Sequence, residues 1–353
     1  MRKELEINFP QIQSYPIFAN ATSVIKGDSA KLWVSTSFLQ LKARNIIIDG
    51  AIDKNLEYYW FDFMMNQTYQ TCPFLNYCPV YKDILDSWPN KKIDYIVSFI
   101  NKGYFISLVI DYYYLQGTSI YLKKHDTHEI LIYGYDLNKK TFLIAAFLQY
   151  GKLNFGEMTF DDFEDATRDE DFLLNYWSGD KIELFSPRTD LIYEPDLIAI
   201  RNTLIEYLEA KNVPNTTFRP HTVNDNNSWV FGLNAYQVLE DTLVYVTKHL
   251  HSHFFWKPFF VIQEHKENIV QLIHYLTQKE VLTGSFELEI AMKNSKNAKV
   301  ILNLYLKYLE NKDLLIINKI VERLHDMIQT EKNILLDIIN KINIHTQNTK
   351  INI

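Results

Sequence analysis

The sequence predicts an α+β protein in which a mixed N-terminal domain precedes a mostly helical C-terminal domain. Residues 104–147 are rich in aromatic and β-branched side chains, which favour strands. Beyond residue 196, apolar side chains recur at the i, i+3, i+4 and i+7 spacing of amphipathic helices. The chain has 353 residues and 47% hydrophobic content, which is enough for two separate cores.

The first part of the N-terminal domain is expected to be helical. Residues 15–41 have apolar positions at helical spacing, interrupted at Gly27, so they predict a helix, a turn and a second helix. Residues 82–102 predict one or two further helices, with an interruption at Pro89 and an end at Gly103.

The strands of this domain are expected after Gly103. Residues 104–115 predict a buried strand, and residues 129–147 predict a hairpin whose turn lies at residues 136–140. The acidic segment that follows, residues 160–172, is typical of a solvated helix or loop.

The change to helical spacing also indicates a domain boundary. We place it near residues 185–198, where two prolines occur, and predict domains at residues 1–190 and 191–353. Residues 213–227 are rich in Asn, Pro and Thr and are expected to form a loop.

Charge and composition exclude several classes of function. The formal net charge of -7 argues against non-specific nucleic-acid binding, which needs a basic surface. Local basic patches remain compatible with an acidic partner, such as a small carrier protein. No glycine-rich phosphate loop is present, so neither a nucleotide nor a metal cofactor is expected. The absence of a secretory signal and of long apolar runs predicts a cytoplasmic protein without a membrane anchor.

Cys72 and Cys78 are the two cysteines of the chain. Two cysteines are too few for a disulfide framework, and no second Cys or His pair stands at metal-binding spacing. We therefore expect two partly buried thiols, with a nucleophilic role assisted by His128 as the alternative.

His128 is the sharpest candidate for a chemical role. It precedes a strand that becomes wholly apolar within two residues, so its imidazole is expected to be held rigidly at the mouth of a cleft. If Tyr135 faces Thr141 across the turn, position 128 faces position 148, with position 146 as a diagonal neighbour. These positions hold Leu148 and Ala146, and neither side chain can orient an imidazole.

Other histidines have simpler explanations. His249, His251 and His253 lie near a helix end, where cationic side chains interact favourably with the helix dipole, although their spacing also resembles a metal cluster. Residues 264–266, Glu-His-Lys, are expected to form a solvated or an inter-helix polar cluster.

The segment that begins at His128 also resembles a known family. A histidine, an apolar strand, the triplet Gly134-Tyr135-Asp136 and a return strand are similar to papain-like cysteine enzymes of the double-glycine leader-peptidase type. The resemblance is greater to the family of the N-terminal domain of butirosin biosynthesis protein H. Within this family type, the composition of the chain suits the amide synthases of closthioamide assembly. The resemblance implies a papain-like cysteine-protease fold for the N-terminal domain.

The family's catalytic residues fall on three positions of this chain. The resemblance makes His128 the catalytic base and places the nucleophilic cysteine at the start of the first long helix, where this chain has Ala21. It places the imidazole-orienting aspartate at Ala146. Either the cysteine has been replaced by engineering, or the natural protein has lost it and serves as a binding module.

The resemblance implies an amide-forming acyltransferase. Such an enzyme moves an acyl or peptidyl chain from the phosphopantetheine thioester of a carrier protein, through a cysteine acyl-enzyme, to a small amine. The alternatives are an inactive papain-like protein that binds a peptide-like ligand or a carrier protein, and a cysteine peptidase. Candidate substrate-binding residues are Tyr15, Asn20 and Asp111, although Asp111 could instead anchor a structural network.

Overall fold

The computed structural model describes residues 1–53, 60–64, 68–87, 91–148, 153–211, 229–249 and 256–351. Contacts divide the chain into two compact units, and each unit combines two segments. Unit 1 contains Met1–Ala30 and Gln67–Ile192, and unit 2 contains Lys31–Asn66 and Tyr193–Ile353. The predicted domains had a single boundary near residue 190, whereas this division also assigns residues 31–66 to the unit that holds the C-terminal helices.

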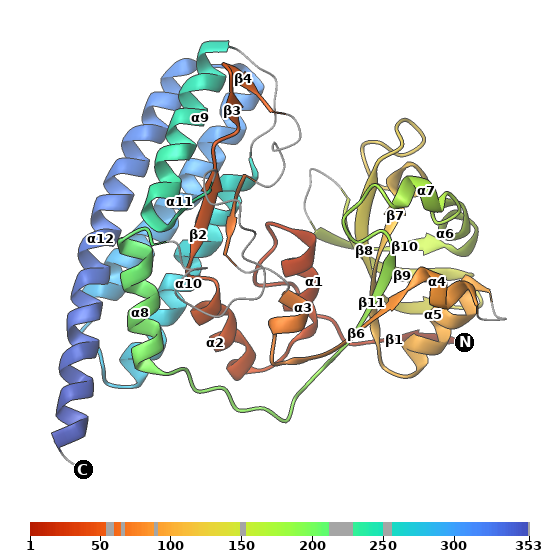
Figure 1. The fold of residues 1–353 in the computed structure, drawn as a ribbon, viewed down its shortest axis with the longest axis horizontal. Helices are drawn as coiled ribbons and strands as arrows, with labels where there is room; N and C mark the ends of the chain where they lie inside the picture. The colour runs from red at the N-terminus through yellow and green to blue at the C-terminus, as the bar shows by residue number, and fades with distance from the viewer. Residues whose placement is uncertain are drawn as a thin grey trace. The chain divides into compact units, whose positions relative to one another are not determined.

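Unit 1 is built on a seven-stranded sheet with strand order β10-β9-β8-β7-β11-β6, and β1 pairs with β8 (Figure 1). All the pairings are antiparallel. The strands are β1 (Arg2–Glu4), β6 (Leu75–Tyr81), β7 (Phe105–Asp111), β8 (Thr127–Asp136), β9 (Thr141–Phe147), β10 (Leu153–Thr159) and β11 (Lys181–Pro187). The prediction of β7 and of the β8–β9 hairpin is confirmed, whereas β1, β6, β10 and β11 were not predicted.

Strand β8 is ten residues long and has two partners on the same edge. Its first half pairs with β7, and its last three residues pair with β1, where Glu4 lies opposite Gly134. A Cβ atom at Gly134 would lie 2.6 Å from the carbonyl oxygen of Lys3, so only glycine permits this close approach.

The two faces of this sheet are covered by different helices. One face, here called the α5 face, packs on α5 (Lys92–Asn101) and α6 (Phe160–Ala166) through the main apolar cluster of the unit. The opposite face, here called the α1 face, packs on α1 (Pro16–Val24) and α3 (Thr68–Thr71). Because strand side chains alternate, neighbours in sequence point to different faces.

Other helices of the N-terminal region agree with the predicted segments. The expected pair of helices in residues 15–41 is confirmed as α1 and α2 (Asp28–Ser37). Residues 82–102 form α4 (Lys82–Asp86) and α5, and residues 88–90, with the expected interruption, lie outside the described residues. The acidic segment is helical rather than a loop: it forms α6 and α7 (Glu170–Leu173), and its apolar side chains are buried against unit 1.

Unit 2 consists of helices that pack on a small sheet, so the prediction of a helical C-terminal region is confirmed (Figure 1). The helices are α8 (Leu197–Leu208), α9 (Ala235–His249), α10 (Lys257–Gln278), α11 (Phe286–Asn311) and α12 (Leu314–Ile351). The sheet has strand order β12-β2-β5, with strands β12 (Trp229–Phe231), β2 (Leu41–Arg44) and β5 (Phe61–Phe63), and a separate two-stranded ribbon joins β3 (Ile47–Ile48) to β4 (Ala51–Ile52). None of the helices in the described part of the chain is long and apolar enough to cross a membrane.

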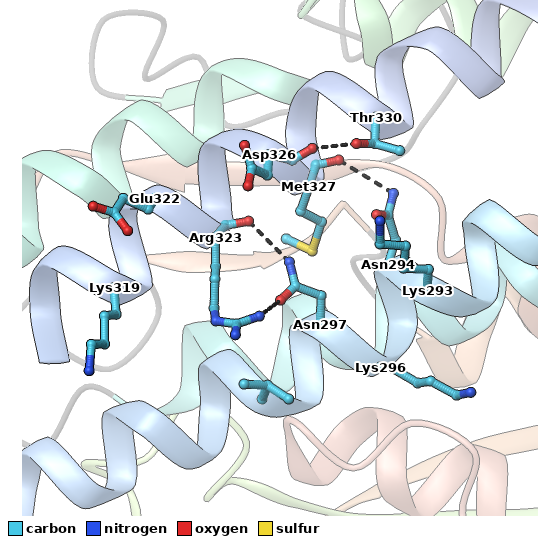
Figure 2. Close-up of a pocket in the computed structure, with 11 residues that line it drawn as sticks. Lys293, Asn294, Lys296, Asn297, Lys319, Glu322, Arg323, Asp326, Met327 and Thr330 are labelled. Atoms are coloured by element: carbon cyan, nitrogen blue, oxygen red, sulfur yellow. Dashed lines mark hydrogen bonds between the residues drawn. The ribbon is translucent and has the colours of Figure 1, made fainter.

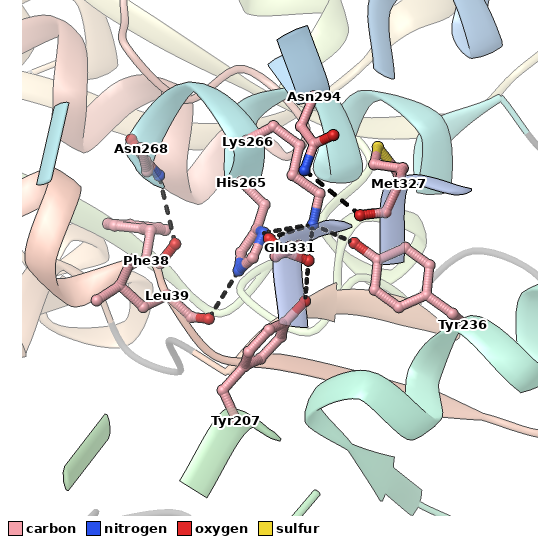
Figure 3. A network of polar contacts seen from close by, with 10 residues as sticks. All are labelled: Phe38, Leu39, Tyr207, Tyr236, His265, Lys266, Asn268, Asn294, Met327 and Glu331. Carbon is pink, nitrogen blue, oxygen red and sulfur yellow. Dashed lines mark hydrogen bonds and ion pairs between the residues drawn. The ribbon is translucent and has the colours of Figure 1, made fainter. Parts of the chain in front are cut away.

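A buried polar network joins the elements of unit 2 (Figure 3). Lys266 on α10 donates to both carboxylate oxygens of Glu331 on α12 at 2.6 Å, and to the hydroxyl of Tyr236 on α9 at 2.6 Å. The hydroxyl of Tyr207 on α8 donates to the same carboxylate at 3.1 Å. The Glu-His-Lys segment is therefore an inter-helix cluster rather than a solvated one, since the side chains of Lys266 and Glu331 are each 1% exposed.

Candidate functional site

The three positions that the family resemblance assigns to catalysis do not come together on one face of the sheet. His128 lies opposite Ile110 in the β7–β8 ladder, and both Ile110 and Ile130 belong to the α5-face cluster. Ala146 belongs to the same cluster. Ala21 lies on α1, which packs against the opposite face of the sheet.

The expected place of Ala21 at a helix start is wrong. Helix α1 begins at Pro16 with Tyr15 as its N-cap, so Ala21 is the sixth of its nine residues. The free amides and the positive end of the helix dipole are confined to the first turn. A thiol at position 21 would therefore lack the environment that lowers a thiol pKa in the family. Tyr15, which we expected to bind substrate, is 2% exposed, and its ring packs edge-on against Phe18.

His128 is held among aromatic rings at the start of β8. Its ring centre lies 4.9 Å from that of Tyr112, 5.8 Å from that of Phe147 and 6.3 Å from that of Tyr176. Its Nδ1 atom lies 3.4 Å from the carbonyl oxygen of Glu129. Aromatic rings thus lie around the imidazole, and Ala146 provides no group that could orient it.

The opposite face of the sheet carries a buried polar cluster, which centres on Asn20. The Asn20 amide donates to the hydroxyl of Tyr69 and to Ser107 Oγ, both at 3.2 Å. Asn20, Tyr69 and Ser107 are at most 2% exposed. Asn20, expected to bind substrate, therefore joins helix α1 to strand β7, and both N–H groups of its amide are used in these internal contacts.

Glu129 and Glu183 lie on this same α1 face. Glu183 pairs with Ser107, and Glu129 pairs with Val109, in the ladders on either side of β7. Both carboxyl groups are buried, and Glu129 accepts a hydrogen bond from Ser178 at 2.9 Å. Burial, with a further contribution from the charge of Glu183, raises the pKa of Glu129 to about 8, and burial also raises the pKa of Glu183.

Asp111 and His125 form a second polar site at the end of β7. Asp111 Oδ1 accepts hydrogen bonds from the backbone amides of Tyr113 and Asp126, at 3.0 and 3.2 Å. Asp111 Oδ2 lies 2.5 Å from His125 Nδ1. Asp111 therefore anchors its own loop, and it also lines a pocket with His125.

His125 is the residue that sequence reasoning missed. It stands three positions before His128, outside any periodic pattern, so nothing local indicated a partner. The signal that could have found it was Asp111 itself, because a carboxylate at the end of an apolar strand needs donors nearby. The antiparallel return of β8 brings residues 125–127 beside that strand end.

A larger groove lies between α11 and α12 in unit 2 (Figure 2). Its volume is about 620 Å³, and hydrogen bonds between Asn297 and Arg323 cross its floor. Four cationic and two anionic side chains line it: Lys293, Lys296, Lys319 and Arg323, and Glu322 and Asp326. This excess of positive charge contrasts with the net charge of -7 of the whole chain.

Neither cysteine is placed to serve His128. Cys72 is buried, and burial raises the pKa of its thiol to about 12, which leaves it protonated. Cys78 is exposed on β6, three strands from β8 in the sheet order, a separation of about 14 Å at the usual strand spacing.

The described residues contain no group of three His, Cys, Asp or Glu side chains that could hold a metal ion. His249 ends α9 and its ring stacks on Tyr245 at 4.1 Å, whereas His251 and His253 lie outside the described residues. The loop predicted at residues 213–227 is also outside them.

Comparison with known proteins gives no family assignment. No protein-family model matches the chain, and no curated protein has a significantly similar sequence.

Proposed function

We propose that this chain is a non-catalytic binding protein of the papain-like type, and that its partner is an acidic carrier protein. The observation that carries the proposal is the basic groove between α11 and α12. Complementary charge attracts an acidic partner and fixes its orientation, and the four cations that line the groove supply that charge.

The chemistry of unit 1 supports a binding role over acyl transfer. Position 21 holds an alanine, which cannot form an acyl-enzyme, and His128 occupies the other face of the sheet. A papain-like origin is supported by helix α1 packed on the sheet and by the strand that leads from His128 to Gly134-Tyr135-Asp136.

The test is a charge-reversal series in the groove. Lys293→Glu, Lys296→Glu and Lys319→Glu, combined in one variant, should weaken binding of a holo acyl carrier protein about tenfold or more at low ionic strength. Wild-type affinity should also fall as salt rises. Affinities would be measured by biolayer interferometry at 50 and 500 mM NaCl, two conditions whose ionic strengths differ about tenfold.

A matched variant carries the same change of charge away from the groove: Lys248→Glu, Lys299→Glu and Lys332→Glu, all exposed on helices of unit 2. It should bind almost as the wild type does. Equal losses in both triple variants, or no binding of the carrier by the wild type, would refute the assignment of the groove.

Acyl transfer to an amine is the second candidate. The observation in its favour is that the hydrogen bond from Asn20 to Ser107 fixes the middle of α1 against β7, so the backbone at position 21 is held in place. The Ala21→Cys variant, made with Cys72→Ser and Cys78→Ser, would be incubated with an acyl-loaded carrier protein and examined by intact-protein mass spectrometry.

Because His128 lies on the other face of the sheet, we expect no acyl adduct that depends on His128. An adduct that forms on Ala21→Cys, is released by an added amine and disappears with His128→Ala would favour the acyltransferase over the binding protein.

A further inference from the structure

The two walls of the groove between α11 and α12 differ in charge (Figure 2). The charged side chains of the α11 wall are Lys293 and Lys296, both cationic. The α12 wall alternates in sign, and its charged side chains are Lys319, Glu322, Arg323 and Asp326. The charges of the α12 wall therefore cancel, and the excess positive charge of the groove lies on α11.

Most of these charges are available to a partner. Arg323 is held in place, because its Nη1 donates to Asn297 Oδ1 at 2.7 Å and its carbonyl accepts from Asn297 Nδ2 at 3.2 Å. Within the part of the chain that the structure describes, the other five charged side chains of the groove form no ion pair. All of them are exposed. A molecule in the groove can therefore pair with charges of both signs.

The groove has the direction and the length of a short helix. Asn294 on α11 donates to the carbonyl of Met327 at 3.4 Å. Asn297, three residues later, donates to the carbonyl of Arg323, four residues earlier, so α11 and α12 run antiparallel. On α12 the lining residues extend from 319 to 330, about 16 Å along the axis. A third helix laid in this seam would bring its own i, i+3 and i+4 rows against both walls.

We propose, on the basis of the function proposed above, that the carrier protein inserts one helix carrying both signs of charge into the groove. Carboxylates on one row of this helix accept hydrogen bonds from Lys293 and Lys296. A lysine or arginine on the neighbouring row donates to Glu322 and Asp326. Recognition then depends on the pattern of charge as well as on its sum, which discriminates against partners that are merely acidic.

The test removes the two anionic side chains and leaves the cations in place. Glu322→Gln combined with Asp326→Asn makes the groove more positive, so attraction by net charge alone would strengthen the binding of a holo acyl carrier protein. We expect this double variant to bind the carrier about threefold or more weakly than the wild type, because the basic side chain of the carrier loses its charged acceptors. Biolayer interferometry at low ionic strength measures both affinities.

The matched control is Glu267→Gln combined with Glu310→Gln, which makes the same change of net charge at exposed positions of α10 and α11 outside the groove. It should bind the carrier as the wild type does, or slightly more tightly.

The result that overturns this inference differs from the one that refutes the proposed function. If the double variant binds the carrier as tightly as the wild type or more tightly, while the reversal of the three groove lysines still weakens binding, the groove recognises only net charge. The proposed function would then stand and the two-sign helix would be wrong. A wild-type protein that does not bind the carrier would refute both.

Discussion

At the scale of single residues, the carboxyl of Glu129 is unusual for its burial and its raised pKa. It is 2% exposed on the α1 face, with Ser178 as its hydrogen-bond donor and Glu183 nearby. Its folded-state pKa, about 8, lies above the ordinary value near 4.5, so the folded protein holds a proton that the unfolded chain releases between these pH values.

This raised pKa predicts how stability depends on pH. The stabilising protonated form is fully present below about pH 4.5, and its advantage is lost as pH rises through about 8. The Glu129→Gln variant keeps a neutral group at this position at both pH values. The difference between its unfolding free energy and that of the wild type should therefore rise by on the order of 3 kcal/mol from pH 5 to pH 8.5. Urea unfolding at both pH values measures this rise.

The control for this prediction is Glu157→Gln, at an exposed position on β10. It should show almost the same pH dependence as the wild type. A Glu129→Gln variant that follows the wild type at both pH values would mean that Glu129 is ionised in the folded protein.

His125 and His128 show what a single sequence can reveal about residues. The apolar strand after position 128 was visible in the sequence, so His128 was placed correctly at the start of a strand. Its face and its partners depended on which helix covers which side of the sheet, and that is decided by contacts between distant segments.

At the scale of elements, the β8–β9 hairpin shows how a register prediction can be partly right. We expected Tyr135 to face Thr141, but Thr141 pairs with Asp136 and Tyr135 with Phe142. An irregularity between Ile132 and Gly134 shifts the register by one residue, so that Leu131 pairs with Ala145. Beyond it the register matches the expected one, and Ala146 lies on the same face as His128, as predicted.

The buried ion pair between Lys266 and Glu331 joins helix α10 to helix α12. Burial and the neighbouring Lys266 lower the pKa of His265 well below its usual value, so this ring is neutral and its Nε2 donates to the carbonyl of Leu39 at 2.8 Å. Only Lys266 therefore balances the charge of Glu331 within the network (Figure 3).

We expect Glu331→Gln to lower the unfolding free energy by about 3 to 5 kcal/mol, because it leaves a buried ammonium group without its counter-charge. The double variant Lys266→Met, Glu331→Leu should recover most of this loss, since two apolar groups need no charge partner. Urea unfolding measures both, with exposed Glu310→Gln on α11 as the control. A loss below about 1 kcal/mol for Glu331→Gln would show that the ion pair is not required.

At the scale of the whole molecule, the chain returns to each unit after leaving it. Residues 31–66 supply β2 and β5 of the unit 2 sheet, and β12 reaches the same sheet from almost two hundred residues later. Strands β2, β5 and β12 have only three or four residues each, too few for a period of two to be recognised.

The sequence by itself determined the fold class, the helical C-terminal region, the central strands and the hairpin. In a long periodic segment, the spacing of the apolar residues shows which side of the helix or strand will be buried. It also showed that position 21 cannot act as a nucleophile. Only the tertiary structure decided that Ala21 and His128 belong to opposite faces of one sheet, that Asp111 orients His125, and that α11 and α12 form a basic groove. These arrangements depend on which distant segments pack together, and packing between segments far apart in the chain leaves no periodic signal in the sequence.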